Sequence, residues 1–151
     1  MNSKWIALCG GIAAVAVLTA PLEVAASKKN KSPEEKAYEY RDGVFHAMGW
    51  KFGQLAANAA RGNKAEFQRA ANDMVALNQM TVEGFIPNSI VPGSLAKKEI
   101  WENWDDFNKR AEDLTAALRT IAADDYDIST FSPKEFGKNC GNCHREYKKR
   151  T

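Results

Sequence analysis

The sequence predicts an all-α protein that folds as an antiparallel four-helix bundle. Apolar residues recur at spacings of three and four in the long segments, which is the period of an amphipathic helix. No segment alternates apolar and polar residues as a half-buried strand does. Short connections containing Gly, Pro or Asn separate the helical segments, and short connections make successive helices antiparallel neighbours.

The composition is that of one globular domain. Of 151 residues, 44% are hydrophobic and 26% are charged, which excludes a wholly disordered chain. The 21 basic and 19 acidic residues give a net charge of +2. A dedicated nucleic-acid binder usually has a much larger excess of basic residues. Three cysteines are too few for a disulfide scaffold.

Residues 1–26 have the three-part layout of a secretory signal peptide. Lys4 precedes an apolar run over residues 5–18, and the small residues at 24–26 form a cleavage pattern. The run is shorter than the roughly 20 residues that a membrane span needs. We therefore expect cleavage after residue 26, no stable membrane anchor, and a mature chain over 27–151 in the periplasm, where unprotected cysteine pairs tend to oxidise.

The first helix of the mature chain is predicted over residues 33–61. Ser32 suits the N-cap, Pro33 suits the first helical position, and Glu35 completes a capping box. Gly62 follows as a helix stop.

Three more helices follow the same logic. The second begins after Asn63 and carries an apolar stripe: Phe67, Ala70, Met74 and Leu77. A loop with Pro at 87 and 92 separates it from the third, which is predicted as one continuous helix from near Lys97. Its stripe steps by three and four throughout: Ile100, Trp104, Phe107, Ala111, Leu114, Leu118 and Ile121. The last helix opens at Ser132 and is expected to reach about Lys149.

One motif in the last helix carries chemistry. The run Cys140-Gly141-Asn142-Cys143-His144 is the attachment signature of c-type haem. Positions i, i+3 and i+4 share one helix face, so both sulfurs can form thioethers with a haem edge while His144 binds the iron. The sequence predicts one covalent haem c per chain, attached through Cys140 and Cys143.

Two other interpretations of the motif are weaker. A thiol–disulfide exchange enzyme would have the motif in a βαβ context, which this sequence lacks. Half of a zinc site would need a second ligand pair, and the other histidine of the chain is His46 on the first helix.

Beyond the motif, the mature chain resembles the cytochrome c′ family, the class II c-type cytochromes, whose known fold is itself a four-helix bundle. The first helix of the family is resembled by Tyr40-Arg41, Phe45, Met48 and Phe52-Gly53. The start of its third helix is resembled by Ile100-Trp101 with Asp106-Phe107, and its last helix by Phe136-Gly137 and Tyr147. A haem motif near the C-terminus is also characteristic of this class. The resemblance implies a covalent haem with His144 as proximal ligand and a homodimer formed through the first helices.

The resemblance also places Phe45 on the far side of the iron. Low-spin relatives have a methionine ligand at this position, whereas phenylalanine has no lone pair to donate. We therefore expect a five-coordinate, high-spin iron with an open sixth site. Arg41, Met48 and Phe52 lie within about 60° of Phe45 on a helical wheel, so these four residues form one inward stripe.

Met48 is the alternative sixth ligand, because it lies one turn from Phe45 and its thioether can bind iron. Ligation would make the protein a low-spin, six-coordinate electron carrier. The competing interpretation is that Met48 fills the core, as methionine commonly does. Met74 and Met80 are expected in the core or packed against loops. His46 is expected to face solvent or a partner subunit.

Two charged residues have family roles by resemblance. Arg41 is expected to contact a haem propionate, although Asp42 replaces the family's usual amide and would repel that group. Lys148 stands on the proximal side where the family usually has arginine, and lysine lacks the planar guanidinium fork.

The motif and the resemblance favour two functions. The first is binding of nitric oxide or carbon monoxide beneath Phe45, an apolar lid with no hydrogen-bond donor for dioxygen. The second is electron transfer to periplasmic redox partners. The sequence has no catalytic triad, phosphate-binding loop or paired acid–base site, so we expect no enzymatic role.

Two surface patterns bear on partners. Small residues on the first helix suit close contact with a neighbouring helix or a second subunit: Gly49, Gly53, Ala57 and Ala60. A basic C-terminus complements the helix dipole as a solvated end or docks an acidic redox partner: Arg145, Lys148, Lys149 and Arg150.

Overall fold

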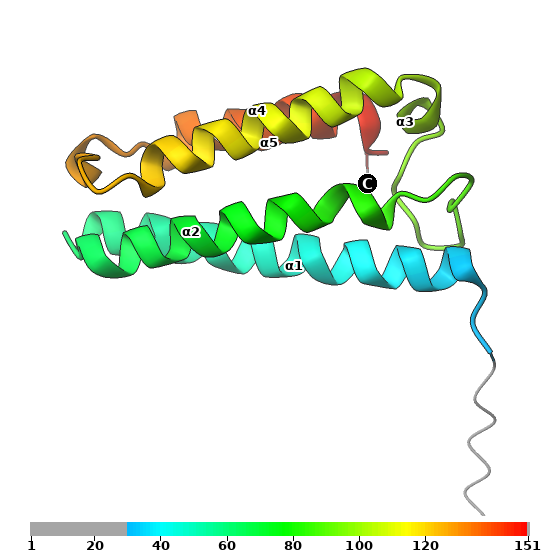
Figure 1. Cartoon of the computed structure of the whole chain (residues 1–151), viewed down its shortest axis with the longest axis horizontal. Helices are drawn as coiled ribbons and strands as arrows, with labels where there is room; N and C mark the ends of the chain where they lie inside the picture. The colour runs from blue at the N-terminus through cyan, green and yellow to red at the C-terminus, as the bar shows by residue number, and fades with distance from the viewer. Residues whose placement is uncertain (1–29, 151) are drawn as a thin grey trace, which may run out of the picture.

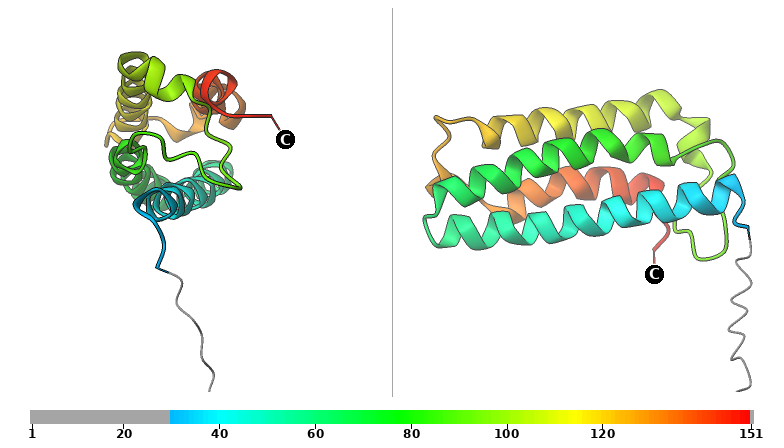
Figure 2. Two further views of the ribbon diagram at one scale, coloured as in Figure 1. Left: turned by 90° about the vertical axis from the view of Figure 1, so that its right-hand side faces the viewer. Right: turned by 60° about the horizontal axis from the view of Figure 1, so that its bottom comes forward.

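The structure, a computed structural model, describes residues 30–150 and contains four long helices. They are α1 (Pro33–Ala60), α2 (Lys64–Thr81), α4 (Trp104–Ala122) and α5 (Pro133–Tyr147). Helices α1 and α2 form one layer and α4 and α5 the other, and the view along the bundle shows these helices running side by side about a common axis (Figures 1 and 2). The predicted all-α four-helix bundle is confirmed. The predicted signal peptide, residues 1–26, lies outside the described residues.

Local capping explains where the helices begin. The Ser32 hydroxyl accepts a bond from the Glu35 amide at 3.2 Å, and the Glu35 carboxylate accepts one from the Ser32 amide at 2.8 Å. Asn63 and Ser132 cap α2 and α5 in the same way, through side-chain oxygens that accept bonds from backbone amides three residues later. Gly62 adopts φ +67° after α1, a conformation that glycine reaches without strain.

The predicted third helix is wrong in one respect, because it is broken at Asn103. A one-turn helix, α3 (Glu99–Glu102), precedes α4. Asn103 leaves the helical conformation at φ −125° and ψ 48°, and both its backbone amide and its side-chain amide donate to the Glu99 carbonyl. A side chain that satisfies a backbone carbonyl in this way competes with continuation of the helix.

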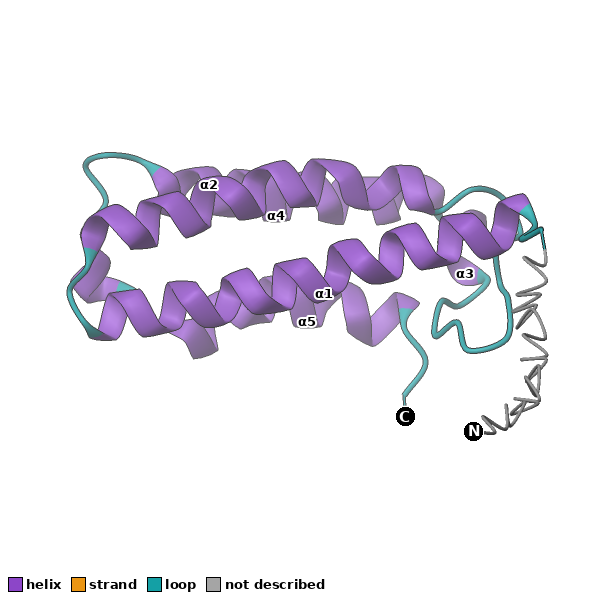
Figure 3. Ribbon diagram, turned by 90° about the horizontal axis from the view of Figure 1, so that it is seen from below, coloured by secondary structure: helices purple, strands orange, loops and turns teal. Residues whose placement is uncertain are grey.

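The last helix ends at Tyr147, two residues before the predicted Lys149. Residues 148–150 turn instead onto the long loop before α3 (Figure 3). The Lys149 amide donates to the Leu95 carbonyl at 2.8 Å, and Lys148 forms an isolated antiparallel bridge with Ala96. Pairing with a distant segment therefore ends α5.

Buried side chains form two clusters along the bundle. The larger one joins all four long helices: Met48, Leu55, Phe67, Ala70, Ala71, Met74, Leu118, Ile121 and Phe136. The smaller one lies near the long loop: Phe85, Ile100, Phe107 and Tyr147. Met74 is in the core as expected, whereas Met80 is 40% exposed. Among residues 30–150, no helix has both the length and the hydropathy needed to cross a membrane.

Candidate haem site

The two motif cysteines lie on the middle turns of α5, between the two clusters. Phe136 belongs to the larger cluster and Tyr147 to the smaller one, and Cys143 packs against the smaller one. Cys140 and Cys143 are free thiols and both are half-buried. Their spacing on one helix leaves both sulfurs on the face that also carries His144.

Phe45 of α1 packs against His144 of α5. The two ring centroids are 6.2 Å apart and the rings meet edge to face at 65°. The structure thus brings together the two residues expected on opposite sides of the iron. Phe45 also meets Phe85 edge to face at 6.2 Å and keeps 38% of its surface exposed.

The other two apolar residues of the α1 stripe belong to the larger cluster. Met48 is only 6% exposed and is one of its buried members. Phe52 stacks on Phe136 of α5 with centroids 6.3 Å apart. The burial of Met48 among apolar side chains favours the interpretation that it fills the core.

Arg41 has partners that the sequence did not predict. Its side chain is 3% exposed, and its terminal nitrogens donate to Gly84, Ser89 and Ser94. These four bonds occupy the four terminal N–H groups, so the Nε–H is the group left to donate a hydrogen bond to a haem propionate. The propionate role of Arg41 stays a prediction.

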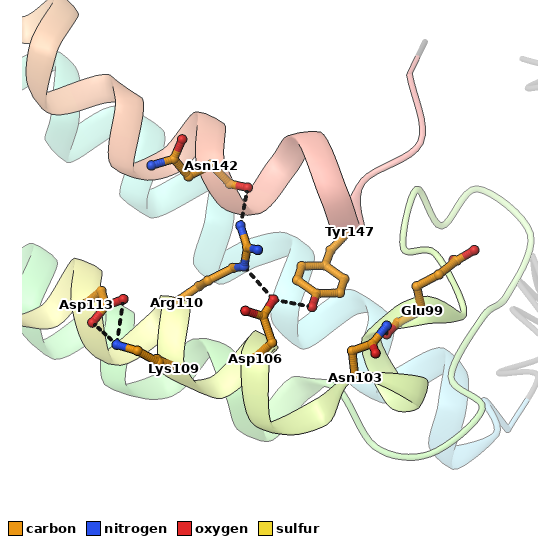
Figure 4. A network of polar contacts seen from close by, with 8 residues as sticks. All are labelled: Glu99, Asn103, Asp106, Lys109, Arg110, Asp113, Asn142 and Tyr147. Carbon is orange, nitrogen blue, oxygen red and sulfur yellow. Dashed lines mark hydrogen bonds and ion pairs between the residues drawn. The ribbon is translucent and has the colours of Figure 1, made fainter.

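A polar network that sequence reasoning missed ties the motif to α4 (Figure 4). Arg110 donates through Nη1 to the Asn142 carbonyl at 2.8 Å and through Nε to the Asp106 carboxylate at 2.6 Å. Tyr147, itself buried, donates its hydroxyl to Asp106 at 2.5 Å. The i, i+4 spacing of Asp106 and Arg110 could have revealed the ion pair. It could not have revealed the partners on α5.

The surroundings of the motif disfavour thiolate chemistry. Burial raises the pKa of Cys140, and burial raises the pKa of Cys143 to about 11. A thiol–disulfide exchange enzyme needs the opposite, a lowered thiol pKa that makes the attacking thiolate. Desolvation, followed by the nearby Lys148 ammonium, lowers the pKa of His144, which favours the neutral imidazole that a metal requires.

The remaining candidate residues lie on the surface. His46 is exposed, 3.5 Å from the Asp42 carboxylate, as expected for a residue facing solvent. A side chain at Gly49 or Gly53 would meet nothing within 4 Å, so these glycines do not mediate a close crossing within the chain. Their role against a second subunit stays a prediction. Within residues 30–150, no three His, Cys, Asp or Glu side chains gather as metal ligands, which gives the zinc interpretation no further donors.

Comparisons with known proteins identify the family of the chain. The family model described as cytochrome c′ matches residues 36–148. The chain is 33% identical to cytochrome c-556 of Agrobacterium tumefaciens (strain II Chrys) over 117 residues, which cover 73% of this chain and 94% of that protein. The chain belongs to the cytochrome c′ family.

Solved structures of the family share this fold. Cytochrome c′ from Shewanella frigidimarina superposes with a TM-score of 0.67 at 26% identity, covering 80% of this chain and all of that one. A variant of cytochrome c′ from Alcaligenes xylosoxidans, solved as its nitric oxide complex, superposes with a TM-score of 0.69 at 20% identity, covering 80% of this chain and 99% of that one.

As a cytochrome c′, this chain carries covalent haem c, and its residues fit that group. Cys140 and Cys143 stand at the spacing of a haem-attachment motif, and both remain free to form thioethers. His144 presents an imidazole on the same face, with the Phe45 ring opposite it. We expect these residues to hold the haem between α5 and α1.

Proposed function

We propose that this cytochrome c′ is a periplasmic protein that binds small diatomic gases, nitric oxide and carbon monoxide, beneath Phe45. The observation that supports the proposal is the edge-to-face contact of the Phe45 ring of α1 with the His144 ring of α5. Bound haem c supplies the iron that coordinates the gas. We assign the protein a binding role rather than a catalytic one.

The chain's own side chains define how a gas would be received. His144 offers the axial nitrogen, and Phe45 offers neither a lone pair nor a hydrogen-bond donor. Phe85 packs edge to face against Phe45, so the expected distal wall is aromatic. Such a wall gives bound dioxygen no hydrogen bond, which favours nitric oxide and carbon monoxide. The nitric oxide complex of the Alcaligenes xylosoxidans relative supports the same ligand class.

The first test is the visible spectrum of the reduced holoprotein with and without carbon monoxide. We expect a high-spin spectrum that changes when the gas is added. Phe45→Ala should bind carbon monoxide faster because it removes the aromatic lid. Phe131→Ala is the matched control, since Phe131 packs against Phe67 and Phe136 in the larger cluster and should leave the rate unchanged.

A methionine introduced at position 45 tests the same site from the opposite direction. Phe45→Met supplies a thioether where low-spin relatives have their ligand, so we expect a low-spin spectrum and loss of carbon monoxide binding. A wild-type spectrum that is already low-spin and indifferent to the gas would contradict the proposal. Loss of that low-spin spectrum in Met48→Leu would then identify Met48 as the ligand.

A second candidate function, electron transfer, is favoured by the charges around His144. Arg145, Lys148, Lys149 and Arg150 are exposed and line, with His144, a hollow of about 470 Å³. None of these cations forms an ion pair with a described residue, whereas Lys98, Lys109 and Arg110 each pair with a carboxylate on their own helix or turn. Glu146 is the one acidic residue among them. An uncompensated basic surface beside the haem ligand suits an acidic redox protein.

The salt dependence of reduction tests this second function. With an acidic redox protein as donor, the rate of haem reduction should fall as ionic strength rises. The double variant Arg145→Glu/Lys149→Glu should slow reduction and weaken that salt dependence. Lys134→Glu is the control, because Lys134 is exposed near the start of α5, away from the hollow. Equal rates in the double variant and the wild type would exclude docking at this surface.

A further inference from the structure

Arg41 is a buried cation whose hydrogen-bond acceptors within residues 30–150 are all uncharged. Its side chain is 3% exposed, and no carboxylate of a described residue lies within ion-pair distance of it. Burial lowers its pKa, as expected for a charge removed from water. A buried charge is retained at a cost unless its hydrogen bonds are satisfied, so the acceptors of Arg41 indicate what it does.

All four acceptors belong to residues 84–94, the segment that leads from α2 towards α3. Nη1 donates to the Gly84 carbonyl at 2.8 Å and to the Ser89 hydroxyl at 2.7 Å. Nη2 donates to the Ser89 carbonyl at 2.5 Å and to the Ser94 hydroxyl at 3.1 Å. Gly84, Ser89 and Ser94 stand at the start, the middle and the end of the segment, so one guanidinium binds it along its whole length.

The segment has few other ties to the bundle. Its backbone bonds within 85–94 are local turns, such as the Ser89 amide to the Ile86 carbonyl and the Ser94 amide to the Val91 carbonyl. Tyr38 donates to the Gly93 carbonyl at 3.3 Å. Phe85 itself packs in the smaller cluster, but these bonds do not fix the middle of the segment, so the position of residues 86–94 over α1 depends mainly on Arg41.

The same guanidinium reaches the aromatic wall of the haem site. The Arg41 Cζ lies 4.9 Å from the centre of the Phe85 ring, and Phe85 meets Phe45. Trp101 donates through Nε1 to the Phe85 carbonyl at 3.0 Å and holds the other side of that residue. A side chain at Gly84 would come within 2.7 Å of the Arg41 Cβ, so the close approach that seats Phe85 requires glycine.

We infer that Arg41 is a positioning residue for gas entry: its fork holds residues 84–94 against α1 and thereby fixes Phe85 behind Phe45. The inference rests on the proposed function, because the Phe45 lid matters only where a gas must pass it. Arg41 is bonded to this segment and lies against the Phe85 ring, so it acts through Phe85.

The test combines two measurements on the holoprotein. Arg41→Met removes the fork and should speed both amide hydrogen exchange within 84–94 and carbon monoxide association, the latter severalfold. Arg41→Lys keeps the charge but not the planar fork, so it should resemble Arg41→Met. Asn78→Ala is the matched control: Asn78 is equally buried and donates to the Ala111 carbonyl and the Thr115 hydroxyl of α4, neither of which belongs to residues 84–94. It should lower stability without changing either measurement.

Three outcomes would overturn the inference. Unchanged exchange in Arg41→Met would mean that the segment is held by other contacts. Faster exchange with a wild-type association rate would mean that the segment does not position the lid. A wild-type rate of carbon monoxide association in Arg41→Lys would mean that the positive charge, and not the planar fork, positions the segment.

Two further arms keep the test decisive. If Arg41→Met does not fold, Ser89→Ala/Ser94→Ala removes two acceptors, leaves Arg41 in place and should give the same two changes. If the wild type binds no carbon monoxide, the proposed function fails by itself. The inference is then decided by the near-ultraviolet circular dichroism of the Trp101–Phe85 contact, which Arg41→Met should change and Asn78→Ala should not.

Discussion

The hydroxyl of Tyr147 links the haem motif to α4. Folding disfavours the ionisation of this hydroxyl. Burial, followed by its hydrogen bond to the Asp106 carboxylate, raises the pKa of Tyr147 from 10.0 to about 12. A pKa raised in the folded state contributes stability that is fully present below about pH 10 and is lost as pH rises through about 12. The protein should therefore lose stability over this alkaline range.

The variant Tyr147→Phe isolates that contribution. It should lower the free energy of unfolding at pH 7 by about 1 kcal/mol, because the hydrogen bond to Asp106 is lost. It should also lose less stability between pH 10 and 12 than the wild type. Urea unfolding across this range measures both effects, with Tyr126→Phe as a control. Parallel pH profiles for Tyr147→Phe and the wild type would contradict the assignment.

At this scale, residue chemistry predicted part of the site. The spacing of Cys140, Cys143 and His144 identified the haem-binding helix without any structure, since helical periodicity alone places them on one face. The resemblance selected Phe45, which the structure brings against His144. The partners of Arg41 could not be predicted, because its acceptors lie 43 to 53 residues away in a loop with no regular pattern.

Among the elements, α1 is the longest and depends on its cap. The reciprocal bonds between Ser32 and Glu35 satisfy two backbone amides that a helix start would otherwise leave unpaired. Ser32→Ala should reduce the free energy of unfolding by about 1 kcal/mol. Thermal unfolding measures the loss, and Ser32→Asp, which restores an acceptor, should recover most of it. An unaffected midpoint in Ser32→Ala would show that packing alone holds the first turn.

The helix boundaries show which signals act locally. The starts after Ser32, Asn63 and Ser132 were predicted because capping involves residues three apart. The break at Asn103 was not, since Ile100 and Phe107 both remain buried and the apolar stripe continues across it. The early end of α5 depends on Leu95 and Ala96, which no local pattern connects to Lys149. Periodicity reports which face is buried, and tertiary pairing decides where a helix stops.

In the whole molecule, the haem site lies where α1 and α5 are joined by few side chains. Phe52 and Phe136 stack beside the larger cluster, and Phe45 and His144 meet nearer the smaller one. Arg110 fastens the motif to α4 rather than to α1. A haem attached to α5 and packed against α1 buries apolar surface only when the bundle is folded, so it contributes to the cohesion of the bundle as well as to its function.

The double variant Cys140→Ser/Cys143→Ser tests this contribution, because it removes both attachment sulfurs while changing little volume. We expect a helical protein with a lower midpoint of thermal unfolding and faster amide exchange along α5. Exchange in the middle of α2, which contributes Phe67, Ala70 and Met74 to the larger cluster, should change least. Cys140→Ser alone keeps one attachment point and should fall between the double variant and the wild type. Amide exchange along α5 that is as slow in the double variant as in the holoprotein would contradict this expectation. It would show that Tyr147 and Phe136 suffice to hold this helix, and that the attached haem does not stabilise the bundle.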